Sequence, residues 1–187
     1  MKAILTVLLL CAAGPAAASA AIIGSGYGHD CYIAARLGHG GRGGLEACNK
    51  AIELEAQSHQ ERAATFVNRG IVRMQSNELV GAIADFDAAI RARPETAEAY
   101  INKGIAVFHL GGRDHDAIQL LTQGIERSPE QPEVAYYVRG IANEQIGEMR
   151  NAYEDYSRAA ALKPGWAEPI SQLQRFSVQR RSAGLAA

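Results

Sequence analysis

Apolar side chains recur three and four residues apart along most of the chain, which is the spacing of one face of an α-helix. In one segment Ala82, Phe86 and Ala89 form such a stripe. In the segment before it, Phe66 and Gly70 lie four residues apart and share a face. Short polar turns separate the segments. The pattern therefore predicts an all-α protein built from paired amphipathic helices.

The paired segments are repeated three times, over residues 67–94, 101–129 and 137–164. The alanines of the second segment and the closing prolines both recur at 35 and 35 residues. A glycine inside a helix costs about 0.5–1 kcal/mol relative to alanine, so a glycine at the same place in every unit indicates a close approach of two helices. The matching positions are Gly70, Gly104 and Gly140; Ala82, Ala117 and Ala152; Phe86, Leu121 and Tyr156; Ala89, Gly124 and Ala159; and Pro94, Pro129 and Pro164.

This combination resembles the tetratricopeptide repeat (TPR), a helix–turn–helix unit of about 34 residues. The resemblance covers roughly residues 60–180 and implies a TPR-type helix–turn–helix solenoid with about 3.5 helix pairs and a C-terminal cap helix. The middle unit departs from the family pattern, because Leu121 and Gly124 stand where an aromatic residue and an alanine are usual.

The resemblance divides the chain into units. Ser58 and Glu61 have the spacing of a capping box at the start of the first full unit. Cys48 stands at the aromatic position of a degenerate N-terminal pair. A solenoid needs a solvating end, and the last helical segment is expected to supply it. The predicted units are 29–57 (degenerate pair), 58–95, 96–131 and 132–165 (full repeats), 166–181 (capping helix) and 182–187 (disordered tail).

The first twenty residues have the features of a secretory signal peptide: Lys2, a short apolar run and small residues before a cleavage site near Ala20. Leu10 precedes Cys11, which argues against lipid attachment at that cysteine. The mature chain would begin with segment 21–28 and keep no membrane anchor. We expect a periplasmic or secreted protein.

The amino-acid composition argues against nucleic acid as a partner and excludes few other classes of partner. The whole chain has a net charge of −1, and removal of the leader would take away one lysine. No basic stripe of the kind that binds nucleic acid is present.

The segment from Gly28 to Cys48 brackets a glycine-rich loop with two cysteines and allows several readings. The loop 38–44 lacks the Lys-Ser/Thr of a phosphate-binding loop. His29, Cys31, His39 and Cys48 include zinc-ligand types, but at spacings that match no familiar zinc pattern. A cysteine nucleophile would need an orienting group that is not evident. Two cysteines in an exported chain favour a Cys31–Cys48 disulfide.

A second correlation lies in the charged residues. The outer two full units carry an arginine directly before the glycine and an aspartate sixteen residues after that arginine, and the middle unit carries neither. We expect an ion pair inside each outer unit. The residues are Arg69 with Asp85 and Arg139 with Asp155, against Lys103 and Leu120 in the middle unit.

The resemblance also implies a candidate binding groove, lined by the first helix of each unit. In related grooves, asparagines two residues before the glycine hydrogen-bond the backbone of an extended peptide, and Asn68 and Asn102 hold that position here. The other expected lining residues are Val67, Ile71, Ile101, Ile105, Tyr137, Val138 and Ile141. Two alternatives stay open: these positions belong to the core, or segment 21–28 covers them. The basic set with which some relatives clamp a terminal carboxylate is missing.

The expected function is that of a non-enzymatic exported adaptor that binds a protein or peptide segment in its concave groove. The alternative is a structural module that self-associates through its apolar surface. Neither cofactor nor metal is expected. We interpret Glu144, Glu148, His109 and His115 as solvated residues, and no set of residues in the sequence forms a catalytic constellation.

Overall fold

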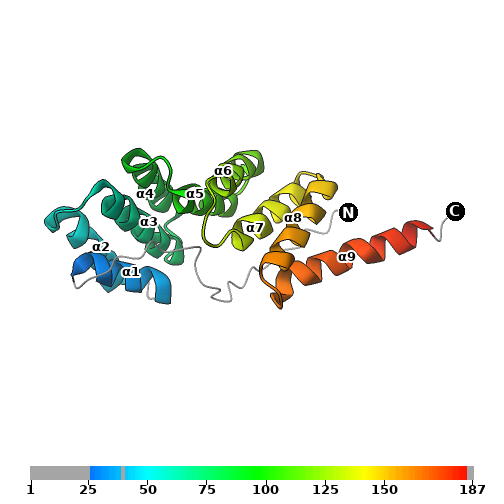
Figure 1. Ribbon diagram of the computed structural model, residues 1–187, viewed down its shortest axis with the longest axis horizontal. Coiled ribbons are helices and arrows are strands. Elements are labelled where there is room, and N and C mark those ends of the chain that lie inside the picture. The colour runs from blue at the N-terminus through cyan, green and yellow to red at the C-terminus, as the bar shows by residue number, and fades with distance from the viewer. Residues whose placement is uncertain (1–25, 39–40, 185–187) are drawn as a thin grey trace.

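The protein, as a computed structural model, is described over residues 26–38 and 41–184, with side chains up to residue 176. Every regular element in these ranges is an α-helix, as predicted, and consecutive helices form antiparallel pairs in a curved row (Figure 1). The helices are α1 (Tyr27–Leu37), α2 (Arg42–Leu54), α3 (His59–Gln75), α4 (Leu79–Ala92), α5 (Ala97–Leu110), α6 (Asp114–Glu126), α7 (Glu133–Gln145), α8 (Met149–Leu162) and α9 (Ala167–Gly184).

A glycine in the first helix of each full pair lies against one large side chain of the second helix. A Cβ atom on Gly140 would lie 2.8 Å from the ring of Tyr156, closer than real contacts allow. Gly70 meets the ring of Phe86 in the same way, and a Cβ on Gly104 would lie 2.8 Å from Leu121. The recurrent glycine is therefore explained by the close approach that it permits.

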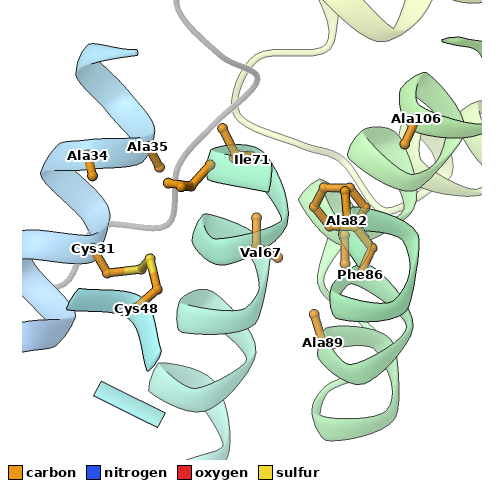
Figure 2. Packing of buried hydrophobic residues seen from close by; sticks show 12 residues of the cluster. Cys31, Ala34, Ala35, Cys48, Val67, Ile71, Ala82, Phe86, Ala89 and Ala106 are labelled. Carbon is orange, nitrogen blue, oxygen red and sulfur yellow. A yellow bond between two sulfur atoms is a disulfide. The ribbon is translucent and has the colours of Figure 1, made fainter. Parts of the chain in front are cut away.

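A disulfide takes the place of this contact in the first pair. Cys31 of α1 and Cys48 of α2 are bonded, with Cα atoms 4.6 Å apart, and neither side chain is exposed. Their separation of 17 residues equals that between Gly104 and Leu121, so Cys31 stands at the glycine position. Figure 2 shows the bond between the two helices and beside α3. The predicted disulfide is present, and its formation leaves neither cysteine free as a zinc ligand or a nucleophile.

The hydrophobic core follows the row of pairs. One cluster joins the disulfide to α3, α4 and α5, and a second joins α5, α6 and α7. Met74, near the end of α3, packs against both clusters. The core is thus continuous from one repeat to the next.

The helix ends show one confirmed prediction and two corrections. The capping box is present: Ser58 accepts from the backbone N–H of Glu61, and Glu61 accepts from that of Ser58. Helix α1 starts at Tyr27, inside the segment predicted to precede it, and α2 starts at Arg42, inside the segment 38–44 that was interpreted as a loop. Glu55 ties these two helices together, because its carboxylate accepts from the backbone N–H groups of Tyr27 (2.6 Å) and Gly28 (3.1 Å).

Helix α9 and Trp166, the residue directly before it, cap the last repeat with aromatic contacts. Trp166 packs on Tyr137, with ring centres 4.9 Å apart, and Phe176 lies against both Tyr153 (5.7 Å) and Tyr156 (6.1 Å). The helix continues to Gly184, so residues 182–184 are helical and the tail predicted from position 182 is shorter. Residues 1–25, which include the predicted leader, and His39 lie outside the described residues. Within the described ranges, none of the helices combines the length and the apolarity needed to cross a bilayer.

The glycine contact yields a stability prediction. Gly70→Ala forces a methyl group into the ring of Phe86, and overpacking of this kind costs about 1–3 kcal/mol. Gly43→Ala in α2 is the matched control, because a Cβ there meets nothing within 4 Å. The control should raise stability by up to about 1 kcal/mol. Urea unfolding of both variants measures the difference, and equal stabilities would contradict the close approach.

Candidate functional site

The two asparagines of the predicted groove point away from the second helix of their own pair. Gly70 and Gly104 face that second helix, and two residues correspond to about 200° around an α-helix. Asn68 and Asn102 therefore lie on the opposite side of α3 and α5, toward the inner face of the row. Their role in binding a peptide stays a prediction.

The two amides differ in their hydrogen bonds. Asn68 is fully buried, and neither its amide nitrogen nor its amide oxygen has a hydrogen-bond partner among the described residues. Asn102 is 3% exposed, and its Nδ2 donates to the carbonyl oxygen of Glu98 at 2.9 Å. Since buried polar groups are nearly always paired, Asn68 is the feature of this face that most needs an explanation.

Most of the apolar residues predicted to line the groove are buried between packed helices. Val67, Ile71, Ile101, Ile105 and Val138 are buried, whereas Tyr137 and Ile141 are half-buried. The first two share a cluster with Ala99 and Ala106 of α5, and the next two share one with Ala135 of α7. Their packing role is established by these clusters, and their contact with a peptide stays a prediction.

The segment considered as a cover for the groove is described only in part. Gly26 is the N-cap of α1, and the next two residues belong to that helix and bond to Glu55. Residues 21–25 lie outside the described ranges.

Three hydrogen-bonding side chains that the sequence analysis did not assign to the groove share its face. Each lies seven residues, or two helical turns, after one of the positions of Asn68, Asn102 and Val138. That spacing could have placed them on the same helix face from the sequence alone. All three are exposed, and Gln75 donates to the carbonyl oxygen of Ala35 at 2.8 Å. Partial burial lowers the pKa of His109, so its imidazole is neutral at pH 7 and can both donate and accept. The residues are Gln75, His109 and Gln145.

The predicted ion pairs of the outer repeats are present. Arg69 donates to Asp85 at 2.6 Å and Arg139 to Asp155 at 2.7 Å, with both aspartates nearly buried. A second donor completes each site: Arg73 donates to Asp85 at 2.7 Å, and Asn143 donates to Asp155 at 3.0 Å. The two outer repeats thus hold their helix pairs together with a charged network in addition to the glycine contact.

The basic residues also connect neighbouring repeats, which the sequence analysis missed. Lys103 of the middle repeat pairs with Asp87 of the preceding repeat at 2.6 Å. Arg69 and Arg139 reach backward in the same manner, to Asn49 and Thr122, each at 2.9 Å. In every case the partner directly follows the aromatic position of the preceding pair. The position of Asp87 directly after Phe86 could therefore have indicated the inter-repeat ion pair from the sequence.

Glu144, interpreted from sequence as a solvated residue, is part of the C-terminal cap. It accepts from the hydroxyl of Tyr156 at 2.8 Å and from Arg175 at 2.7 Å. Burial, and then the contact with Glu144, raises the pKa of Tyr156, so this tyrosine stays protonated throughout the physiological range. The glutamate therefore joins α7, α8 and α9.

These ion pairs should differ in their contribution to stability. Asp85→Asn leaves two arginines facing a neutral group at a site that is 3% exposed, and the expected cost is on the order of 3 kcal/mol. Asp87→Asn removes a partner that is 39% exposed, and the expected cost is about 0–1 kcal/mol. Thermal unfolding of the two variants compares them. A larger loss for Asp87→Asn would show that the inter-repeat pair is the stronger one.

Comparison with known proteins agrees with this architecture. Residues 67–132 match a family model described as tetratricopeptide repeat. The human mitochondrial import receptor subunit TOM70 is 28% identical over 123 residues, which are 62% of this chain, and the chain spans only 19% of the receptor.

Solved structures resemble this one over most of its length. The first TPR of Spaghetti (RPAP3), bound to HSP90 peptide SRMEEVD, is 21% identical with a TM-score of 0.59, over 72% of this chain and 99% of that one. The crystal structure of MamA is 20% identical with a TM-score of 0.63, over 87% of this chain and 99% of that one. At these identities the likeness shows a shared fold.

Proposed function

Because the chain is a tetratricopeptide repeat protein, and so a scaffold for protein interaction, we propose that it is non-enzymatic and binds an extended segment of a partner protein along its inner face. In this proposal Asn68 and Asn102 hydrogen-bond the backbone of the bound segment. The fold comparison supports the proposal, since one structural neighbour was solved with a peptide bound.

The observation that carries the proposal is the buried, unpartnered amide of Asn68. A buried polar group without a partner costs about 1–3 kcal/mol, and the free protein bears that cost. An amide side chain offers both a donor and an acceptor, and an extended backbone presents one of each per residue. Because the amide is closed off in the free protein, a peptide would reach it only after the residues that cover it shift, and binding would then give Asn68 the partners that the free protein does not supply.

In the proposed contact, the protein recognises the extended shape and the backbone of the bound segment more than any particular side chain. Asn68 and Asn102 stand at equivalent positions of neighbouring repeats, so their amides follow the repeat axis. Gln75, His109 and Gln145 add further donors and acceptors along the same face. We expect the bound segment to pass over at least two repeats, with its ends free of a charged clamp.

We also propose that the protein acts outside the cytoplasm, in the periplasm or after secretion. The leader-like first twenty residues motivate this placement. The Cys31–Cys48 disulfide supports it, because such bonds persist in oxidising compartments.

The alternative of self-association has weaker support. Among the described residues, the exposed large apolar side chains are distributed over six helices, α1, α2, α4, α5, α8 and α9. Light scattering at several protein concentrations separates the two functions, since a scaffold for a partner segment is expected to have a constant mass.

The peptide contact is testable with a displayed library of random unstructured peptides. We expect peptides to be enriched on the protein. The double variant Asn68→Ala with Asn102→Ala should raise the Kd of an enriched peptide roughly 30-fold, because two hydrogen bonds of about 1 kcal/mol each are lost. Gln119→Ala, an exposed amide on a second helix, is the control and should leave the Kd unchanged. Unchanged binding by the double variant would reject the inner face as the site.

A single substitution separates binding from stability. Asn68→Leu replaces the unpartnered amide by an apolar group of similar size, so the free energy of unfolding should rise by about 1 kcal/mol. The same change should abolish the hydrogen bonds to the enriched peptide and weaken its binding. Denaturant unfolding and calorimetric titration of one preparation give both values. A loss of stability would mean that Asn68 has a structural partner.

A further inference from the structure

A polar cleft of about 220 Å³ lies between the second helices α6 and α8, with α7 beneath it. It is separate from the inner face, which the first helices form. Arg139, Asn143 and Asp155 form the interior of the cleft, and Asn151 and Glu154 stand at its exposed edge. Ile118 of α6 adds an apolar wall.

The first full repeat holds a guanidinium group at the equivalent place. Arg73 donates to Asp85 at 2.7 Å and to the carbonyl oxygen of Gly81 at 3.2 Å. Its aliphatic stem lies over Gly81, where a Cβ would be 3.2 Å from Cδ. Asn143 and Asn151 stand 70 residues after Arg73 and Gly81, and Asp155 stands 70 residues after Asp85.

The third repeat therefore has the acceptors of this site without its built-in cation. Asn143 donates to Oδ2 of Asp155 at 3.0 Å, the same carboxylate oxygen that Arg73 reaches on Asp85. Asparagine is several atoms shorter than arginine, so the volume that the guanidinium fills in the first repeat is left open.

The charge at the two sites also differs. The first-repeat site has two arginines and one aspartate, a net charge of +1. The third-repeat site has Arg139 with Asp155 and Glu154, a net charge of −1, because Glu154 replaces Ala84. Glu154 does pair with Arg150, but their side chains are 60% and 90% exposed, and such pairs contribute little.

We propose that this cleft binds an arginine side chain presented by a partner protein. The guanidinium would lie as that of Arg73 lies in the first repeat, donating to the carboxylates of Asp155 and Glu154. Its aliphatic stem would pack on Ile118. Arginine fits better than lysine, because its planar fork donates to two acceptors at once and is more weakly hydrated. The site is independent of the peptide contact proposed for the inner face.

The test is an NMR titration with N-acetyl-arginine amide, using N-acetyl-citrulline amide as the uncharged probe of the same shape. We expect saturable shifts of the side-chain amide signals of Asn143 and Asn151 with the arginine probe and none with citrulline. Asn68→Ala with Asn102→Ala should retain these shifts, which separates this site from the inner face.

Two variants complete the test by copying the first repeat. Asn143→Arg with Asn151→Gly supplies the missing cation from within, and the arginine-induced shifts elsewhere in the cleft should disappear. Glu154→Ala changes one exposed residue and keeps the fold. It should weaken binding of the arginine probe several-fold. The proposal is overturned if citrulline gives the same shifts, if the arginine shifts do not saturate, or if Glu154→Ala leaves the affinity unchanged.

Discussion

The structure depends on one short-range contact that is made once in every helix pair. A position in the first helix meets a residue sixteen or seventeen positions later in the second helix. In three pairs the contact joins a glycine to a large side chain, and in the first pair a disulfide joins Cys31 to Cys48. This contact fixes the distance between the two helices of a pair. The remaining helix faces can then pack on the neighbouring pairs, and the stacked first helices form the inner face.

Charged residues beside this contact perform two tasks at once. The basic residue before each glycine bonds within its own pair, to the preceding pair, or to both, and Lys103 uses only the inter-repeat bond. The first and third repeats differ in what completes the aspartate site, Arg73 in one and Asn143 in the other. That difference gives two otherwise equivalent repeats different surfaces, one filled and one open.

The period of the sequence was enough to predict contacts inside a unit. The helix pairs, the capping box of Ser58 and the disulfide all depend on residues at fixed offsets along one or two helices. The bond from Lys103 to Asp87 and the cleft beside Asn143 were missed, because they depend on how far one pair is rotated against the next. The early start of α2 was also missed, since its glycine-rich first turn gives no apolar signal. The burial of Asn68 could not be predicted either, because it depends on how the helices pack around it.

In the first pair, the disulfide substitutes for the glycine contact. Native-state hydrogen exchange of the oxidised and the reduced protein tests it directly. Closure of a loop of this size contributes about 3 kcal/mol, so the amides of α1 and α2 should lose roughly 100-fold in protection on reduction. The amides of α5 to α8, which rely on Gly104 and Gly140, should keep theirs. Unchanged protection in α1 and α2, or an equal loss along the whole chain, would show that the disulfide does not replace the glycine contact.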